Sequence, residues 1–191
     1  MNPCAAELRG RQYDHALSLS GIVAIHNYRA ADGTLLYQLV RLRPRGRRWR
    51  RPDPASPGGW TWSRQGVPRV LYRLPELLKA DAAAWTFIVN TERAADAIAA
   101  LGLTGTCCPG GIRRWCKVSD WSALAGRRLC IIVPSESLTA WIYAEDVARR
   151  LADKVAVVKI VALPGRDKSV YDWIKSYGAA QHKAKGRSTH V

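Results

Sequence analysis

The chain has 191 residues, and its 30 lysines and arginines against 15 aspartates and glutamates give a formal net charge of +15. Hydrophobic residues make up 48% of the sequence and include 8 tryptophans, which is enough for the packed core of one domain or two small ones. This composition excludes an acidic solvating tail and a wholly disordered chain.

The absence of targeting signals and the spacing of the cysteines indicate which class of protein this is. No apolar run reaches the roughly 20 residues of a membrane span, and the first residues lack the basic-then-apolar order of a secretory signal, so we expect a cytoplasmic protein without a membrane partner. The 5 cysteines contain no C-x-x-C pair, which favours buried apolar residues over a disulfide framework or a zinc site.

The first part of the chain is predicted to be rich in β-structure. We expect an N-terminal arm over residues 1–15 and a basic region over 16–80. Two extended runs flank Asp32-Gly33, a dipeptide typical of a hairpin turn, and two short strands are expected at 59–62 and 67–72. A short helix is expected to open at Pro75.

An arginine-rich block interrupts this region. It holds seven arginines in eleven residues without an acidic residue, and the proline- and glycine-rich stretch 52–59 follows it, so we expect a loop that carries a block of charge. The arginines of the block are Arg41, Arg43, Arg45, Arg47, Arg48, Arg50 and Arg51.

The second part, residues 81–176, alternates short apolar runs with helical stretches, which predicts a compact α/β domain. Its sheet should be mainly parallel and four-stranded with crossover helices. Strands are expected at 85–89, 104–108, 129–133 and 155–161, and helices at 92–101, ending at Gly102, and at 140–151. Residues 177–191 form a basic C-terminal tail.

Several motifs of this part follow one another in a familiar order. They are VNTERAADAI (89–98), LGL (101–103), PGGIRRW (109–115), IVPSESLTA (132–140) and LPG (163–165) with SVYDWI (169–174). In this order they resemble the Toprim domain of phage and plasmid primase-helicase proteins, and the segment before them resembles what precedes Toprim there. The resemblance covers most of residues 24–176 and implies the α/β fold just described.

The resemblance also shows what has changed. In that family a glutamate serves as general acid/base and, with two aspartates, holds Mg²⁺ for phosphoryl transfer. Asn90 stands at the glutamate, and Ser135 and Ser137 stand at the aspartates. Amide and hydroxyl groups lack the charge that dehydrates Mg²⁺, and neither accepts a proton near neutral pH. We therefore expect a catalytically degenerate site without a metal ion or other cofactor.

Three carboxylates nearby keep an alternative open. Glu136 lies between the two serines, Glu92 begins a predicted helix, and Asp172 matches the last aspartate of the closing motif. With them, the alternative hypothesis is a weak metal-dependent primase or nuclease that uses Mg²⁺. Glu136 should point away from the serines, Glu92 suits the helix dipole, and Asp172 is expected to cap a helix.

The arginine block favours a nucleic-acid partner. Guanidinium groups pair with phosphates and aromatic faces stack on unpaired bases, which suits a single strand or a fork of DNA or RNA. Because clustered like charges repel, an anion should screen the block. The candidate binding residues are the seven arginines with Trp49, beside Trp60, Trp62 and Tyr72, and, further along, Arg113, Arg114 and Lys117.

The leading hypothesis is therefore a stand-alone, degenerate Toprim protein that binds nucleic acid in the replication, repair, defence or counter-defence of a mobile element. We expect it in the nucleoid or in the cytoplasm of a phage-infected host. The G-x-x-x-x-G-K-[ST] motif of a nucleotide-binding motor does not occur in the sequence. A second alternative is an interaction protein that mimics a Toprim subunit in a replication or nuclease complex.

Overall fold

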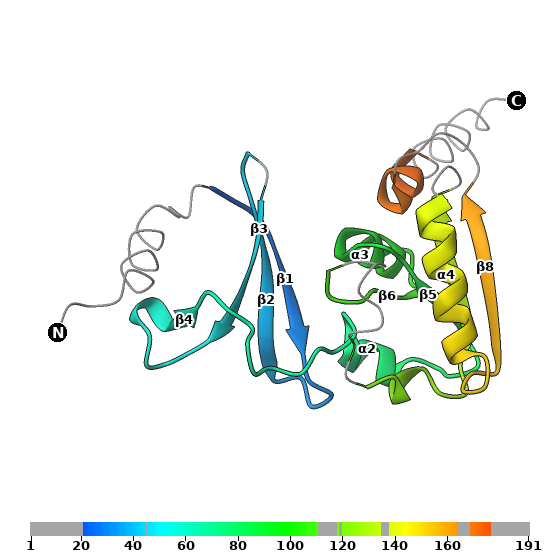
Figure 1. Ribbon diagram of the computed structural model, residues 1–191, viewed down its shortest axis with the longest axis horizontal. Helices are drawn as coiled ribbons and strands as arrows, with labels where there is room; N and C mark the ends of the chain where they lie inside the picture. The colour runs from blue at the N-terminus through cyan, green and yellow to red at the C-terminus, as the bar shows by residue number, and fades with distance from the viewer. Residues whose placement is uncertain are drawn as a thin grey trace, which may run out of the picture. The chain divides into compact units, whose positions relative to one another are not determined.

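The computed structural model describes residues 21–44, 46–110, 118, 120–134, 138–163 and 169–176. They form two compact units, one of residues 21–27 and 35–67, the other of 28–34 and 68–176. A helical segment at 170–176 closes the described chain. The other elements are β1 (Ile22–Arg29), β2 (Leu35–Leu42), β3 (Gly46–Pro52), η2 (Pro57–Gly59), β4 (Trp60–Thr61), α2 (Leu74–Lys79), β5 (Trp85–Ile88), α3 (Glu92–Ala100), β6 (Thr104–Thr106), η4 (Ser122–Leu124), β7 (Arg128–Pro134), α4 (Leu138–Leu151) and β8 (Val157–Leu163) (Figure 1).

The first four strands form one sheet in the order β1-β2-β3-β4. The turn between β1 and β2 has Gly33 at a φ of 90°, and the Thr34 backbone N–H donates to Asp32 Oδ1 at 2.8 Å. This hydrogen bond stabilises the charged carboxylate of Asp32 and therefore lowers its pKa. The predicted hairpin at Asp32-Gly33 is confirmed.

The arginine block is not one loop, as its charge and its prolines suggested. Arg43 lies in the turn between β2 and β3, and the other described arginines lie in the two strands, Arg41 in β2 and Arg47, Arg48, Arg50 and Arg51 in β3. The strands pair antiparallel, with Arg41 opposite Arg47 and Leu39 opposite Trp49. Apolar side chains explain the difference, because Tyr37, Leu39 and Val40 of β2 are almost completely buried. Long arginine stems can also cover apolar surface while their charged ends reach water, so the strands tolerate the charge.

The expected strand at 67–72 is absent from the structure, whereas β4 pairs with β3 through Trp60 and Thr61. Pro68 has no N–H to donate to a ladder, and Arg73, with a φ of 59°, turns the chain away from an extended course. The Tyr72 N–H does bond to the Cys107 carbonyl at 2.9 Å, but this contact does not continue as a ladder. The predicted short helix follows as α2.

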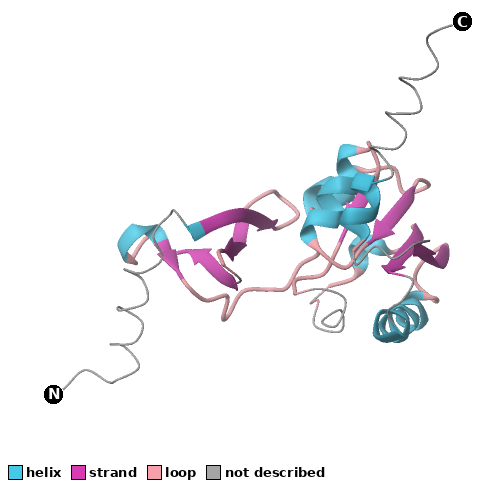
Figure 2. Cartoon of the chain, turned by 90° about the horizontal axis from the view of Figure 1, so that it is seen from above, coloured by secondary structure: helices cyan, strands magenta, loops and turns pink. Residues whose placement is uncertain are grey.

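The second unit has the predicted parallel sheet, in the order β6-β5-β7-β8, with α3 and α4 as crossover helices (Figure 2). All four predicted strands and both predicted helices are present, with ends that differ by a few residues. The mixed α/β fold class, with an antiparallel β-rich region before it, is confirmed. In this part of the chain the sequence patterns were clear because buried strands alternate with amphipathic helices.

Local residues explain how α3 is placed on the sheet. The Thr91 side chain accepts a hydrogen bond from the Ala94 N–H at 3.3 Å and caps the helix N-terminus, and Gly102, with a φ of 76°, follows its C-terminus. Helix α3 lies so close to β6 that a Cβ on Gly105 would stand 2.8 Å from the Ala95 carbonyl oxygen. The glycine therefore sets the distance between helix and sheet.

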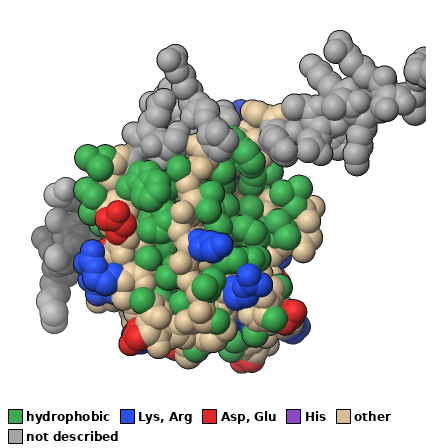
Figure 3. Space-filling view, turned by 90° about the vertical axis from the view of Figure 1, so that its right-hand side faces the viewer, with side chains coloured by type: hydrophobic (Ala, Val, Ile, Leu, Met, Phe, Trp, Pro, Cys, Tyr) green, Lys and Arg blue, Asp and Glu red, His purple; other side chains and the backbone are tan. Residues whose placement is uncertain are grey.

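Helix α4 packs beside β7 and β8 and contributes Ala140, Ala144, Val147 and Leu151 to the main core. Figure 3 shows the side on which α4 and β8 lie in Figure 1, where hydrophobic side chains cover much of the surface around scattered lysines and arginines. Among the described residues, no helix is both long enough and apolar enough to cross a bilayer. Exposed apolar residues on these two elements are Leu138, Ile142, Val157 and Val161.

Candidate functional site

The β2–β3 register divides the arginines between two faces of the sheet. Side chains of successive strand residues point to opposite faces, so Arg41 and Arg47 share one face with Trp49. Arg48 and Arg50 lie on the other face. A ligand on one face therefore meets only part of the block. Arg45, also among the predicted binding residues, lies outside the described residues.

On the second face, tryptophans and an amide hold Arg50. Its guanidinium carbon lies 4.1 Å from the ring centroid of Trp60 and 5.6 Å from that of Trp62. Its Nε donates to Gln38 Oε1 at 2.7 Å, and the Gln38 amide in turn donates to Asn27 Oδ1 at 2.6 Å. Partial burial lowers the pKa of Arg50, but a guanidinium stays charged at neutral pH. These contacts fix the orientation of a charged group.

A similar stack occurs on the first face. The guanidinium carbon of Arg64 lies 4.2 Å from the ring centroid of Trp49, whose edge contacts Tyr37 at a centroid distance of 5.5 Å. One side of the Trp49 ring is thus covered by a cation, a contact that stabilises the pair by about 0.5–2 kcal/mol. Arg64 and Gln38 were missed at the sequence level, since their sequence positions do not indicate these contacts.

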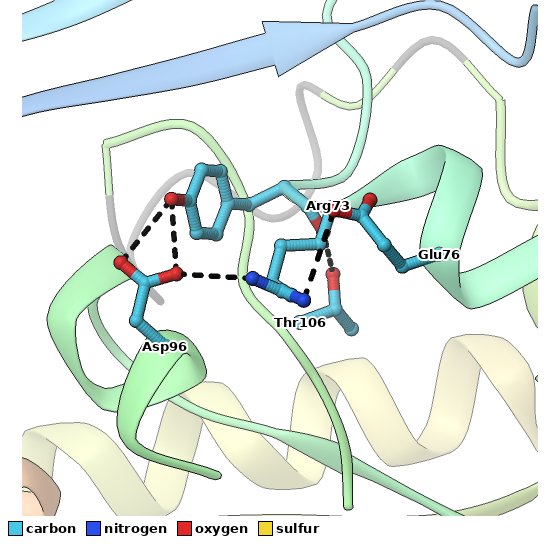
Figure 4. Close-up of polar contacts among 5 residues, drawn as sticks. Arg73, Glu76, Asp96 and Thr106 are labelled. Atoms are coloured by element: carbon cyan, nitrogen blue, oxygen red, sulfur yellow. Dashed lines mark hydrogen bonds and ion pairs between the residues drawn. The ribbon is translucent and has the colours of Figure 1, made fainter. Parts of the chain in front are cut away.

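Tyr72, grouped in the sequence with the aromatics of the basic region, instead belongs to a polar network in the second unit (Figure 4). Its hydroxyl donates to Asp96 Oδ1 at 3.0 Å, and Arg73 Nη1 lies 3.4 Å from the same oxygen. Thr106 Oγ1 donates to the Tyr72 carbonyl at 2.7 Å, and Arg73 Nη2 is 3.7 Å from Glu76. Burial raises the pKa of Tyr72, so the hydroxyl remains a donor.

Of the three positions at which the resemblance places catalytic carboxylates, the structure describes Asn90 alone. It follows β5, and its Oδ1 is buried without a hydrogen-bond partner. Ser135 and Ser137, with Glu136 between them, lie outside the described residues. Arg113, Arg114 and Lys117 do as well, so the predicted extension of the basic surface stays a prediction.

Glu92, the first residual carboxylate candidate, points into the second unit. Its side chain is 4% exposed, and Tyr28 donates its hydroxyl to Glu92 Oε1 at 2.7 Å. The Tyr28 ring packs against Tyr72 at a centroid distance of 5.2 Å. Burial, followed by the nearby Glu92 charge, raises the pKa of the Cys107 thiol. This carboxylate therefore has a structural partner. The partner was not predicted because it lies 64 positions away in the sequence.

Asp172, the second such candidate, is engaged at the start of the helical segment 170–176. Its Oδ2 accepts a hydrogen bond from Ser169 Oγ at 2.5 Å, and its N–H donates to the same Oγ at 3.1 Å. The N-terminal cap is thus Ser169, not Asp172 as expected. Asp172 stands three residues later, and both of these hydrogen bonds go to the hydroxyl of this cap; in a capping box its carboxylate would accept from the backbone N–H of the cap instead.

The described residues do not form a site that fits the Mg²⁺ implied by the resemblance. They contain no group of three or more His, Cys, Asp or Glu side chains placed to hold a metal ion. The unpaired Asn90 oxygen is a single neutral ligand, whereas Mg²⁺ is usually held through carboxylates. Burial of Cys107, Cys108 and Cys130 agrees with the apolar role predicted for them.

The Tyr28–Glu92 contact gives a testable prediction. Tyr28→Phe should lower the free energy of unfolding by about 2 kcal/mol, because a buried carboxylate loses a charged hydrogen bond. Glu92→Gln keeps an acceptor oxygen and should cost about 1 kcal/mol. A double-mutant cycle by urea denaturation should give a coupling energy above about 0.5 kcal/mol, and additive effects would argue against the contact.

No family model matches the chain, and no curated protein matches it. Several solved structures, in contrast, match the chain. The primase fragment of the bacteriophage T7 primase-helicase protein matches with a TM-score of 0.57 at 14% identity, over 84% of this chain and 60% of that one. A DNA primase domain from Pseudomonas aeruginosa matches with a TM-score of 0.52 at 15% identity, over 93% and 59%. The DnaG catalytic core matches with a TM-score of 0.51 at 10% identity, over 91% and 60%.

The chain has a Toprim-like primase fold. The matches cover 84% and 93% of this chain in the first two of these structures. The chain spans about 60% of the length of these structures. At such low identity the likeness establishes the fold, and the predicted resemblance to Toprim is confirmed at that level.

Proposed function

We propose that this chain is a nucleic-acid-binding protein built on a primase-like Toprim fold, in which metal-dependent phosphoryl transfer has been lost. It binds the phosphate backbone of a single strand or fork, of DNA or of RNA. The arginine hairpin β2–β3 is the principal contact. The primase character of the structural neighbours supports a nucleic-acid partner over other polyanions.

The observation that carries this proposal is the cross-strand pair of Arg41 and Arg47. Like charges directly opposite each other on antiparallel strands destabilise a sheet, and an anion between them removes that cost. Arg64, stacked over Trp49 on the same face, adds a third cation in a fixed orientation. Phosphates along a nucleic-acid strand are the polyanion that such a row of cations fits.

The loss of catalysis rests on the side chains at the expected site. Asn90 offers a neutral amide, and Ser135 and Ser137 offer hydroxyls in place of carboxylates. Glu92 and Asp172 are engaged by Tyr28 and Ser169, which supports a structural role for both. A general base and a metal clamp are therefore not expected here.

Fluorescence anisotropy with a labelled single-stranded oligonucleotide tests this proposal, in EDTA and in Mg²⁺. We expect binding in EDTA that Mg²⁺ does not strengthen, because the ion competes for the phosphates, and no primer or cleavage products with Mg²⁺ or Mn²⁺. Metal-dependent product that Glu92→Gln or Glu136→Gln abolishes would instead establish a weak primase or nuclease. Failure to bind any oligonucleotide at low salt would favour an interaction protein that mimics a Toprim subunit.

Restoring the carboxylates gives a second prediction. The variant Asn90→Glu, Ser135→Asp, Ser137→Asp should melt at a lower temperature than the parent without Mg²⁺, because three clustered carboxylates repel one another. Mg²⁺ should recover the stability of this variant and leave the parent unchanged. Thermal unfolding in EDTA and in Mg²⁺ measures this. An unchanged melting temperature in both conditions would show that the three positions do not cluster.

A further inference from the structure

A cluster of cations around one aromatic ring lies on the second unit, apart from the arginine hairpin in sequence. The Arg93 guanidinium carbon is 3.9 Å and the Lys175 Nζ is 5.9 Å from the centroid of the Tyr171 ring. Arg93 is the second residue of α3, and Tyr171 and Lys175 are four residues apart in the helical segment 170–176. That spacing puts the two on one face of the helix.

The cluster lies at the carboxyl end of the parallel sheet. Strand β5 ends at Ile88 and α3 begins at Glu92, so Arg93 stands three residues after Asn90. In open α/β sheets, ligands bind outside the carboxyl ends of the strands. The positive end of the α3 dipole points to the same region and favours an anion there.

Among the described residues, the cations of this cluster have no carboxylate counterion. In the part of the chain that the structure describes, no carboxylate lies within salt-bridge distance of Arg93 or Lys175. The nearest acidic groups in sequence, Glu92 and Asp172, accept hydrogen bonds from Tyr28 and Ser169. Hydrogen bonding with Arg93 and the charge of Lys175 lower the pKa of Tyr171, which agrees with an uncompensated positive field around the hydroxyl.

We propose that Arg93 and Lys175 bind one backbone phosphate of a nucleic acid, with Tyr171 as the positioning residue that holds the guanidinium. The guanidinium supplies a fork of donors that matches phosphate oxygens, and the ammonium adds a point charge. Arg93 covers one face of the Tyr171 ring, so the ring orients the cation. This inference rests on the proposed function, since it assigns a second contact to the same class of ligand.

The test compares two double variants that remove equal charge. Arg93→Ala with Lys175→Ala removes the cluster, and Arg149→Ala with Arg150→Ala removes two exposed α4 arginines near Asp146. Binding of a 20-nucleotide oligothymidylate is measured against salt. Losing one phosphate contact should lower the slope of log K against log salt by about 0.7, and the affinity about 5-fold at 0.1 M salt. The α4 control should leave the slope unchanged.

Three further arms separate the explanations. Tyr171→Phe should bind as the parent does, and Tyr171→Ala should reproduce most of the cluster variant's loss; equal binding by both would overturn the positioning role. Thymidine monophosphate should compete only weakly with the oligonucleotide. If it competes as strongly as an unlabelled oligonucleotide does, the ligand of the cluster is a free nucleotide, and the proposed backbone phosphate is wrong. If the cluster variant matches the α4 control while hairpin variants lose affinity, this inference fails and the proposed function stands. If the parent does not bind, the proposed function itself fails.

Discussion

Replacing Arg41 and Arg47 by alanine should weaken binding to single-stranded DNA about 25-fold at 0.1 M salt and lower the salt slope by about 1.4. These values follow from two lost phosphate contacts at about 0.7 each. The two arginines lie opposite each other on one face of the β2–β3 hairpin, so one strand of nucleic acid can reach both. The loss should be the same on unrelated sequences, because phosphate contacts carry no base information.

The matched control is Arg48→Ala, which removes a charge from the opposite face of the same hairpin. It should change the affinity less than about 5-fold, the value of one phosphate contact at 0.1 M salt. Fluorescence anisotropy across a salt series measures all variants, and circular dichroism checks that the hairpin folds. Equal losses per arginine from both faces would show a diffuse electrostatic attraction. No loss from either face would remove the hairpin from the binding surface.

Replacing Arg127 by methionine should lower the free energy of unfolding by about 3 kcal/mol. This arginine is 6% exposed and donates to the carbonyl oxygens of Leu77 at 2.7 Å and Ala123 at 2.9 Å. It also donates to the carbonyls of Ala80 and Asp81, so it ties α2 to η4 and the start of β7. The variant removes all of these hydrogen bonds, of which those to Leu77 and Ala123 are buried, and a hydrogen bond to a charged group contributes about 1.5–3 kcal/mol.

Two companion variants make this prediction specific. Arg127→Lys should recover only part of the loss, because an ammonium cannot reproduce the planar fork of donors. Arg128→Met removes the exposed neighbour, whose guanidinium carbon lies 4.5 Å from the Trp85 ring centroid, and should cost less than about 1 kcal/mol. Urea denaturation measures all three. Equal losses at positions 127 and 128 would contradict the structural role assigned to Arg127.

The sequence predicted the parallel unit well because its signals are local. Thr91 caps α3, Gly102 ends it, and short apolar runs mark β5 and β7, so each element can be found from its own residues. The arginine hairpin was predicted wrongly as a loop. Its charges and prolines obscured the strand, and the apolar partner that stabilises β3 lies on β2.

For the candidate site, the sequence predicted the type of residue but not the arrangement. The block of arginines was visible, but its division between two faces depends on the register of Arg41 against Arg47. The engagement of Glu92 by Tyr28, and the pairing of Arg93 with Tyr171, join positions far apart in sequence. No local pattern encodes such contacts, since they depend on how the elements pack.

The salt dependence of nucleic-acid binding by the unaltered chain tests the central claim most directly. Affinities for two single-stranded oligonucleotides of unrelated sequence are measured from about 0.05 to 0.3 M salt in EDTA. With three to five phosphates contacted, log K should fall with log salt at a slope of about −2 to −3.5, equally for both sequences. A slope near zero, or binding that requires Mg²⁺, would contradict metal-independent recognition of the phosphate backbone.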